Sequence, residues 1–327
     1  MTMINKIHTF GKFLDQPVLI AKFEKSMPFL MSAGGALALG KIAHDVFQKT
    51  DDKNERKRQI LSRSIVLTAS IISALLAPKI ASKVTNRTPL STIEKVKEDN
   101  LKLINNFIEK NKPDDAALNI LNKAKEKILS FKETQTLFEK VEDKDFLEKL
   151  IPDPVAVSSK DIIKEIGYLS VYGAVPVMGG VLGGITADSV TGEDIKKTIP
   201  DKIKEGAYQY LANIFMCNIG AAMGLGVLET MNVKSKSARA GAMIAGIILT
   251  GVIGGSKIAN FISDKFIDKF AKIKTKQKER TPEPLDLFLH TDDIATVSVL
   301  SGLKWIEPAL PVLYSVSGYR AGIGYRN

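Results

Sequence analysis

Lys304 and Glu307 are the pair of residues in the sequence best placed to do chemistry, because they stand three positions apart inside an apolar segment. Side chains three apart share one face of a helix, so the ammonium group and the carboxylate could neutralise each other. An ionisable pair inside a membrane is a candidate ion or proton site. Trp305 favours the alternative, in which these side chains mark the headgroup level at one end of a membrane helix.

Three further polar residues, Asp188, His44 and Asp45, fall just past the ends of apolar segments. One interpretation is a proton or cation site, and the other is the ordinary polar end of a helix at the membrane surface. The remaining histidines, His8 and His290, likewise have no Cys, His or Glu neighbour at a metal-ligand spacing. The sequence therefore predicts no metal site.

Catalytic motifs are missing from the sequence. It contains neither a Gly-x-Ser-x-Gly elbow nor a His-Glu-x-x-His pair. The glycine-rich run 251–257 lacks the Gly-Lys-Ser/Thr of a phosphate loop and falls inside an apolar segment. An enzyme would have to assemble its site from scattered residues. We predict a protein without enzymatic activity, catalytic residues or a cofactor.

Three segments contain no charged residue: 166–187, 206–228 and 240–256, which are 22, 23 and 17 residues long. A helix rises about 1.5 Å per residue, so roughly 20 apolar residues cross a hydrocarbon core about 30 Å thick. The first two segments reach that length, and the third comes close. Their pattern is typical of membrane-spanning helices.

Three other apolar segments are weaker candidates. Segments 26–40 and 64–78 hold 15 uncharged residues each, and they span only if Lys41 and Lys79 extend their ammonium groups to the interface. A buried or partly inserted helix pair is the alternative. The last segment, 294–319, is interrupted by its two charged residues. The sequence thus predicts an all-α polytopic membrane protein with about six apolar helices in three hairpins.

The charge pattern divides the chain. We predict an amphipathic segment over 1–26 on a membrane surface, a first hairpin over 27–84 and a soluble charged helical insert over 85–164. A second hairpin over 165–230 and two helices over 239–320 follow, with a basic amphipathic linker over 257–280. Alternating Lys and Glu with a narrow apolar stripe over 91–150 indicates either two or three helices folded together or a surface for a protein partner.

Glycines four positions apart recur in the apolar segments. This spacing lets the backbones of two membrane helices approach closely. It predicts a tight bundle or a homo-oligomer, held by Gly179, Gly183, Gly180, Gly184, Gly220, Gly224, Gly251 and Gly255.

The net charge of +10 could suggest a nucleic-acid partner, but residues 85–164 hold 15 basic and 15 acidic residues. The surplus therefore flanks the apolar segments, where Lys and Arg contact anionic lipid headgroups. We predict a protein of a cell membrane, plasma or inner, that binds no nucleic acid. Its predicted role is structural or interactive. The alternatives are a transporter or channel with Lys304, Glu307 and Asp188 facing a cavity, and a membrane-embedded enzyme.

Overall fold

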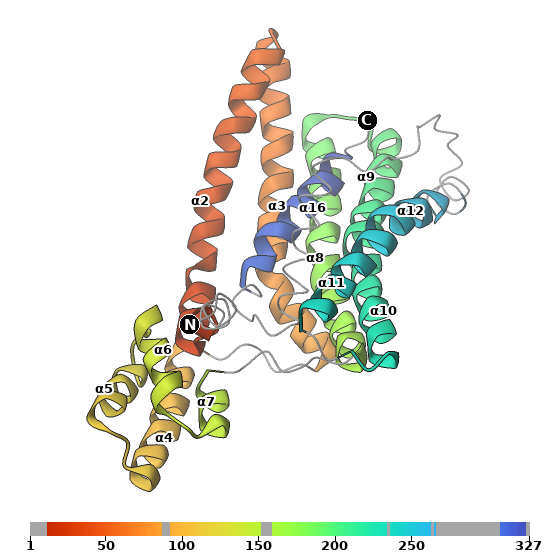
Figure 1. Cartoon of the computed structure of the whole chain (residues 1–327). Helices are drawn as coiled ribbons and strands as arrows, with labels where there is room; N and C mark the ends of the chain where they lie inside the picture. The colour runs from red at the N-terminus through yellow and green to blue at the C-terminus, as the bar shows by residue number, and fades with distance from the viewer. Residues whose placement is uncertain are drawn as a thin grey trace. The chain divides into compact units, whose positions relative to one another are not determined.

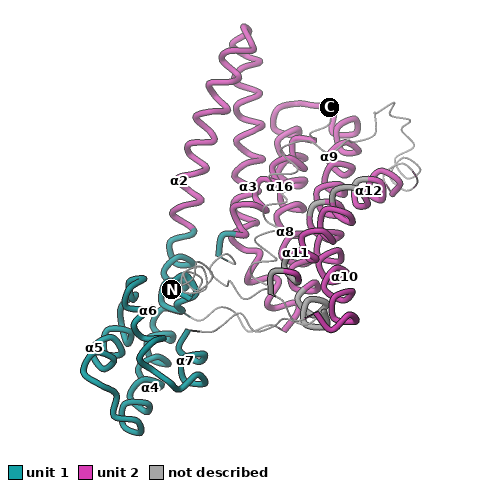
Figure 2. Tube along the Cα trace, in the orientation of Figure 1, with its two compact units in different colours: residues 1–27, 90–157, 298–309 teal, residues 28–89, 158–297, 310–327 magenta. Residues whose placement is uncertain are grey.

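The structure is a computed structural model that describes residues 12–86, 92–151, 159–233, 236–262, 265 and 308–324. Throughout these ranges the regular elements are helices, which confirms the predicted all-α class. The chain divides into two compact units (Figure 2). Unit 1 comprises 1–27, 90–157 and 298–309, and unit 2 comprises 28–89, 158–297 and 310–327.

Unit 1 contains the start of α2 (Pro17–Lys49) and four helices of the insert. These are α4 (Ile93–Asn111), α5 (Asp115–Ala124), α6 (Phe131–Lys140) and α7 (Lys144–Leu150). Each insert helix begins after a residue whose side chain accepts a hydrogen bond from a backbone N–H of the first turn: Thr92, Asp114, Ser130 and Asp143. Such caps satisfy amide groups that a helix start leaves unpaired.

The insert helices pack around a core of their own. Leu121, Leu137 and Ile104 are fully buried there, and Phe107 stacks on Phe146 with ring centroids 3.9 Å apart. The insert has four helices where the apolar spacing predicted two or three. The difference arises because the caps Ser130 and Asp143 start two short helices, α6 and α7, where the apolar pattern predicts a single helix.

The N-terminal segment was predicted to lie on a membrane surface, and its described part packs on the insert. Its described residues belong to unit 1, where Val18 and Ala21 pack with Val96 of α4. The Gln16 side chain accepts a hydrogen bond from Leu129 N–H at 2.7 Å and donates one to the Leu129 carbonyl at 2.9 Å. Among the described residues, Val18 and Ala21 of this segment are therefore covered by the insert. Residues 1–11 lie outside the described ranges.

Unit 2 holds the rest of α2 and a bundle of longer helices (Figure 1). Its elements are α3 (Lys53–Thr85), α8 (Ser159–Thr191), α9 (Ile195–Tyr210), η1 (Leu211–Phe215), α10 (Met216–Thr230), α11 (Lys236–Ile247), η2 (Ile248–Gly255), α12 (Ser256–Ile262) and α16 (Leu310–Ile323). Helix α8 packs against α3 and α16, and α10 packs against α11. Helix α9 lies beside both α8 and α16.

Two helices in the described ranges are long and apolar enough to cross a membrane: α3, and residues 166–191 of α8. They contain the predicted segments 64–78 and 166–187. A shorter apolar helix covers 241–251. The segments 206–228 and 240–256 are each interrupted by a π-helical stretch, η1 and η2 respectively. Segment 294–319 is described only from residue 308, and the basic linker 257–280 only at 257–262 and 265.

The two π-helical stretches contact each other. A π turn widens the helix and disturbs its regular hydrogen bonds, so nearby side chains often bond to the affected carbonyls. Thr250 Oγ1 donates to the Met216 carbonyl at 3.0 Å and to the Gly246 carbonyl at 2.7 Å. Cys217 Sγ donates to the Ala212 carbonyl at 3.2 Å. The bond from Thr250 to Met216 ties the helix of 195–230 to the helix of 236–262, and the other two bonds lie within one helix each.

Candidate functional site

Helix α8 uses adjacent glycines to contact two helices at once. Gly179 and Gly183 face α3, where a Cβ on Gly183 would lie 2.5 Å from the Ala69 Cβ. Gly180 and Gly184 face the opposite neighbour, α16, and a Cβ on either would meet a backbone carbonyl there. The paired glycines therefore let α8 sit tightly between α3 and α16.

A second set of glycines joins α10 to α11 and η2. Gly220 and Gly224 lie against the backbone of α11. Gly251 lies against the buried Cys217 thiol, and a Cβ on Gly255 would be 2.8 Å from the Ala212 Cα. All eight glycines singled out in the sequence thus occupy close approaches between helices.

Three further glycines occupy equivalent positions but were not among those predicted. Gly246 faces Gly220, Gly318 faces Pro176, and Gly322 faces Gly180. The sequence did hold a signal for them. Gly318 and Gly322 are four apart, and Gly246 is four from both Ala242 and Thr250.

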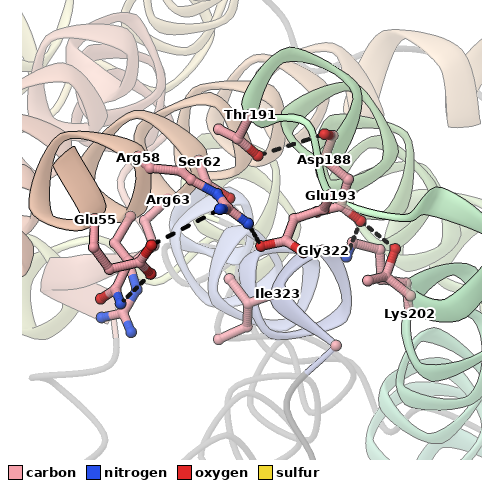
Figure 3. A pocket seen from close by; sticks show the side chains of 13 residues that line it. Glu55, Arg58, Ser62, Arg63, Asp188, Thr191, Glu193, Lys202, Gly322 and Ile323 are labelled. Atoms are coloured by element: carbon pink, nitrogen blue, oxygen red, sulfur yellow. Dashed lines mark hydrogen bonds and ion pairs between the residues drawn. The ribbon is translucent and has the colours of Figure 1, made fainter.

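A polar cavity of about 540 Å³ lies where the starts of α3 and α9 meet the ends of α8 and α16 (Figure 3). Three regions that are far apart in sequence form it: residues 55–63, 188–202 and 322–324. Its lining includes three acidic and three basic side chains: Glu55, Asp188, Glu193, Arg58, Arg63 and Lys202. Ser62, Gln59, Thr191 and Thr198 add hydroxyl and amide groups.

Asp188 and Lys202 form a buried ion pair at the inner side of this cavity. The Lys202 Nζ donates to Asp188 Oδ2 at 2.7 Å, and the two side chains are 6% and 7% exposed. Thr198 donates a further hydrogen bond to the same carboxylate oxygen. Asp188 was a predicted polar candidate, and the structure gives it two partners on α9.

Arg58 engages two carboxylates of the cavity. It pairs with Glu193, and its other terminal nitrogen is 3.9 Å from Glu55. Gln59 also donates to Glu55 at 2.8 Å. In contrast, Arg63 and Ser62 make no hydrogen bond or ion pair with the residues that the structure describes.

Helix α9 carries a buried polar face that continues inward from the cavity. Thr198, Lys202, Glu205 and Gln209 follow one another at intervals of three and four, which places them on one face of the helix. Glu205 and Gln209 are both 0% exposed, and the Gln209 amide donates to Glu205 at 2.8 Å. This face could not be recognised in the sequence, because 188–205 is the charged stretch between the uncharged segments 166–187 and 206–228 and has the pattern of a connection between helices.

Contacts with α8 fix the depth of that polar face. Lys202 lies at the level of Gly184, and a Cβ on Gly206 would be 3.1 Å from Val181 and 3.5 Å from Val177. Val177 is near the midpoint of the uncharged segment 166–187. The polar face therefore runs alongside the apolar part of α8 to about its middle.

Two of the other predicted polar residues, His44 and Asp45, do not line this cavity. His44 and Asp45 lie on α2, where Asp45 is 3.3 Å from the Lys41 ammonium and 3.5 Å from His44. Lys304 and Glu307 lie outside the described residues. Within the described ranges, no group of three or more His, Cys, Asp or Glu side chains could hold a metal ion.

Comparisons with protein-family models, with curated proteins and with solved structures found no match to this chain.

Proposed function

We propose that the chain is an integral membrane protein whose unit 2 is a glycine-packed helical bundle in the bilayer and whose unit 1 is a water-exposed helical module for a protein partner. One observation carries the membrane part. Met178 and Leu182, in the middle of α8, are 63% and 62% exposed, whereas Lys204 and Glu205 of neighbouring α9 are 2% and 0% exposed.

This distribution is the reverse of what water favours. Exposed apolar side chains lose the hydrophobic free energy of burial, and buried charges cost desolvation energy. A lipid solvent removes the first penalty, because hydrocarbon tails contact the outward Leu and Met side chains. It also explains why ionisable residues turn toward the bundle interior. The outward side chains of α3, Ile72 and Leu76, are exposed in the same way.

The glycine contacts support a structural role. Without a hydrophobic drive between helices, close van der Waals packing must hold a membrane bundle together. Contacts of this kind join α8 to α3 and α16, and α10 to α11. Such a bundle suits a rigid anchor, and its outward apolar residues also allow contact with a second copy. The insert at 92–151 has a separate core and a charged surface, which suits a soluble partner.

Membrane extraction tests the proposal. After expression in bacteria, the protein should stay in the membrane pellet through an alkaline carbonate wash and should dissolve only with detergent. A control protein that is bound only peripherally to the membrane surface should be released by the wash. Release of this protein into the carbonate supernatant as a monodisperse species would contradict the proposal.

Transport of a small solute or ion is the second candidate, and the buried polar face of α9 favours it. A reconstituted protein that conducts should show proton or potassium flux above that of empty vesicles. Glu205→Gln should then lower the flux, whereas Glu98→Gln in unit 1 should not. Flux equal to that of empty vesicles with both ions would remove this candidate.

A further inference from the structure

The polar cavity lies where the apolar parts of two candidate spans end. Arg63 immediately precedes the uncharged segment 64–78 of α3, and Asp188 immediately follows the uncharged segment 166–187 of α8. Both residues line the same cavity. If unit 2 is inserted as proposed, the cavity is therefore at the headgroup level of one leaflet.

The charged side chains that line the cavity differ in whether they already have a partner. Asp188 already binds Lys202 and Thr198, and Glu193 and Glu55 already face Arg58. An entering cation would have to displace one of these internal partners. Arg63 differs, because its guanidinium has no ion pair or hydrogen bond among the residues described. The neighbouring Ser62 hydroxyl is in the same situation. Among the residues described, the cavity therefore offers the donors of Arg63 and Ser62, which have no partner, while its three acidic and three basic side chains sum to zero charge.

We propose that this cavity binds a phosphate group through Arg63 and Ser62, and that the headgroup of an anionic phospholipid supplies it. The guanidinium carries five N–H donors in a planar fork that matches the oxygens of a phosphate, and it stays charged at every physiological pH. Hydrogen bonds between such charged groups are about twice as strong as neutral ones. Arg58 is not a further contact, because Glu193 and Glu55 already face its guanidinium.

The size and composition of the cavity agree with this ligand. Its volume of about 540 Å³ is within the range of small-molecule pockets, roughly 300 to 1,000 Å³. Lys202 does not serve as the ligand contact, since Asp188 holds its ammonium group at 2.7 Å. The pair instead fixes α9 against the end of α8. The phosphate chemistry rests on the cavity itself, and only the lipid source rests on the proposed membrane insertion.

Binding by the full chain in uncharged maltoside micelles tests the proposal. The probes are short-chain phosphatidylglycerol, glycerol phosphate and short-chain diacylglycerol, which separate the lipid, the phosphate alone and the tails alone. We expect saturable binding of phosphatidylglycerol in calorimetry, weaker binding of glycerol phosphate, and none of diacylglycerol. Equal binding of diacylglycerol and phosphatidylglycerol, or no saturable binding of either phosphate compound, would overturn the proposal.

Matched variants locate the site. Arg63→Gln should weaken phosphatidylglycerol binding by about tenfold or more, the amount expected for a lost hydrogen bond to a charged group. Lys57→Gln removes the same charge from an exposed position of α3 that does not line the cavity. It should change the affinity by less than about twofold, which is typical of a screened surface charge. Arg63→Lys, which keeps the charge without the fork, should give an intermediate affinity.

The outcomes separate this proposal from the proposed membrane insertion. Equal losses in Arg63→Gln and Lys57→Gln would mean unspecific attraction and would overturn the site. Binding of glycerol phosphate that depends on Arg63, in a protein extracted without detergent, would keep the phosphate site and remove the lipid as its source. Circular dichroism of each variant without ligand checks that the fold is retained.

Discussion

Gly180 of α8 and Gly318 of α16 meet backbone to backbone. A Cβ on Gly180 would collide with the carbonyl group of Gly318, and a Cβ on Gly318 would collide with the carbonyl group of Pro176. One turn further along, Gly322 approaches the Gly180 carbonyl in the same way. No side chain separates the two helices along this line. The contact holds the short C-terminal helix against a candidate membrane span.

Replacing one of these glycines should loosen the bundle. Gly180→Ala places a methyl group against backbone that no rotamer change can move, and overpacking of this kind costs about 1–3 kcal/mol. The melting temperature of the detergent-solubilised protein should fall. Gly34→Ala makes the same change in α2, where nothing lies within 4 Å of the new methyl group, and should leave the melting temperature unchanged or slightly higher. Equal effects of the two substitutions would argue against the close contact.

The buried ion pair should behave as a coupled unit. Asp188→Ala leaves the Lys202 ammonium without its carboxylate in a buried position, a change that typically costs 3–5 kcal/mol. Combining Asp188→Ala with Lys202→Met removes both charges and should cost clearly less than the sum of the two single changes, Asp188→Ala and Lys202→Met. Chemical unfolding of all four proteins gives the coupling energy. A coupling energy near zero would show that the pair does not form.

Gln16 should be necessary for the N-terminal segment to stay on the insert. Gln16→Ala removes a side chain that bonds both backbone groups of Leu129, and each buried polar group left unpaired costs about 1–3 kcal/mol. Limited proteolysis should then cleave unit 1 faster than in the original protein. Gln48→Ala, at an exposed position of α2, serves as the control. An unchanged cleavage pattern in Gln16→Ala would count against the packing of this segment.

The capping box of α6 should weaken in acid. The hydrogen bond from Lys123, with further bonds from Ser130, lowers the pKa of Glu133 from 4.5 to about 2. The charged carboxylate therefore stabilises the fold fully above about pH 4.5, and this stabilisation is lost as the pH falls towards 2. Because the pair is partly exposed, its contribution is at most about 1 kcal/mol.

Hydrogen exchange of peptide 130–140 in the full chain measures this effect. After correction for the intrinsic exchange rate, protection should decline between pH 4.5 and 2. Glu133→Gln should show lower protection at pH 7 and a smaller decline. A decline of the same size in Glu133→Gln would assign the pH dependence to other groups.

Local patterns in the sequence predicted the parts of the fold that depend on neighbouring residues. Pro113 followed by Asp114 is a local signal for a helix break and a helix start, and Asp114 does cap α5 by accepting from the Ala117 N–H at 2.7 Å. The helical period predicted the all-α class. The four-residue glycine spacing singled out positions that lie between helices, since spacing alone decides which residues share a helix face.

Features that depend on distant segments could not be predicted. The polar cavity is lined by residues at the ends of α3, α8, α9 and α16. Neither Arg63 nor Lys202 belongs to a sequence motif that would indicate a binding site. The polar face of α9 could not be recognised in the sequence, because Lys202 and Glu205 resemble the charged residues of a water-exposed connection between helices. The π-helical stretches have no proline or other local signal. They coincide with the close contacts of Gly251 and Gly255 with the neighbouring helix.

Membrane insertion of unit 2 is the central claim, and cysteine accessibility in intact vesicles tests it most directly. On a Cys217→Ala background, single cysteines replace Thr50 and Lys196 at the cavity end, Met231 beyond α10, and Met178 in the middle of α8. A water-soluble maleimide should label positions 50 and 196 from one side and position 231 from the other. Position 178 should react only after detergent is added. Labelling of Met178→Cys as fast as Lys196→Cys in intact vesicles, or labelling of all positions from one side, would contradict the claim.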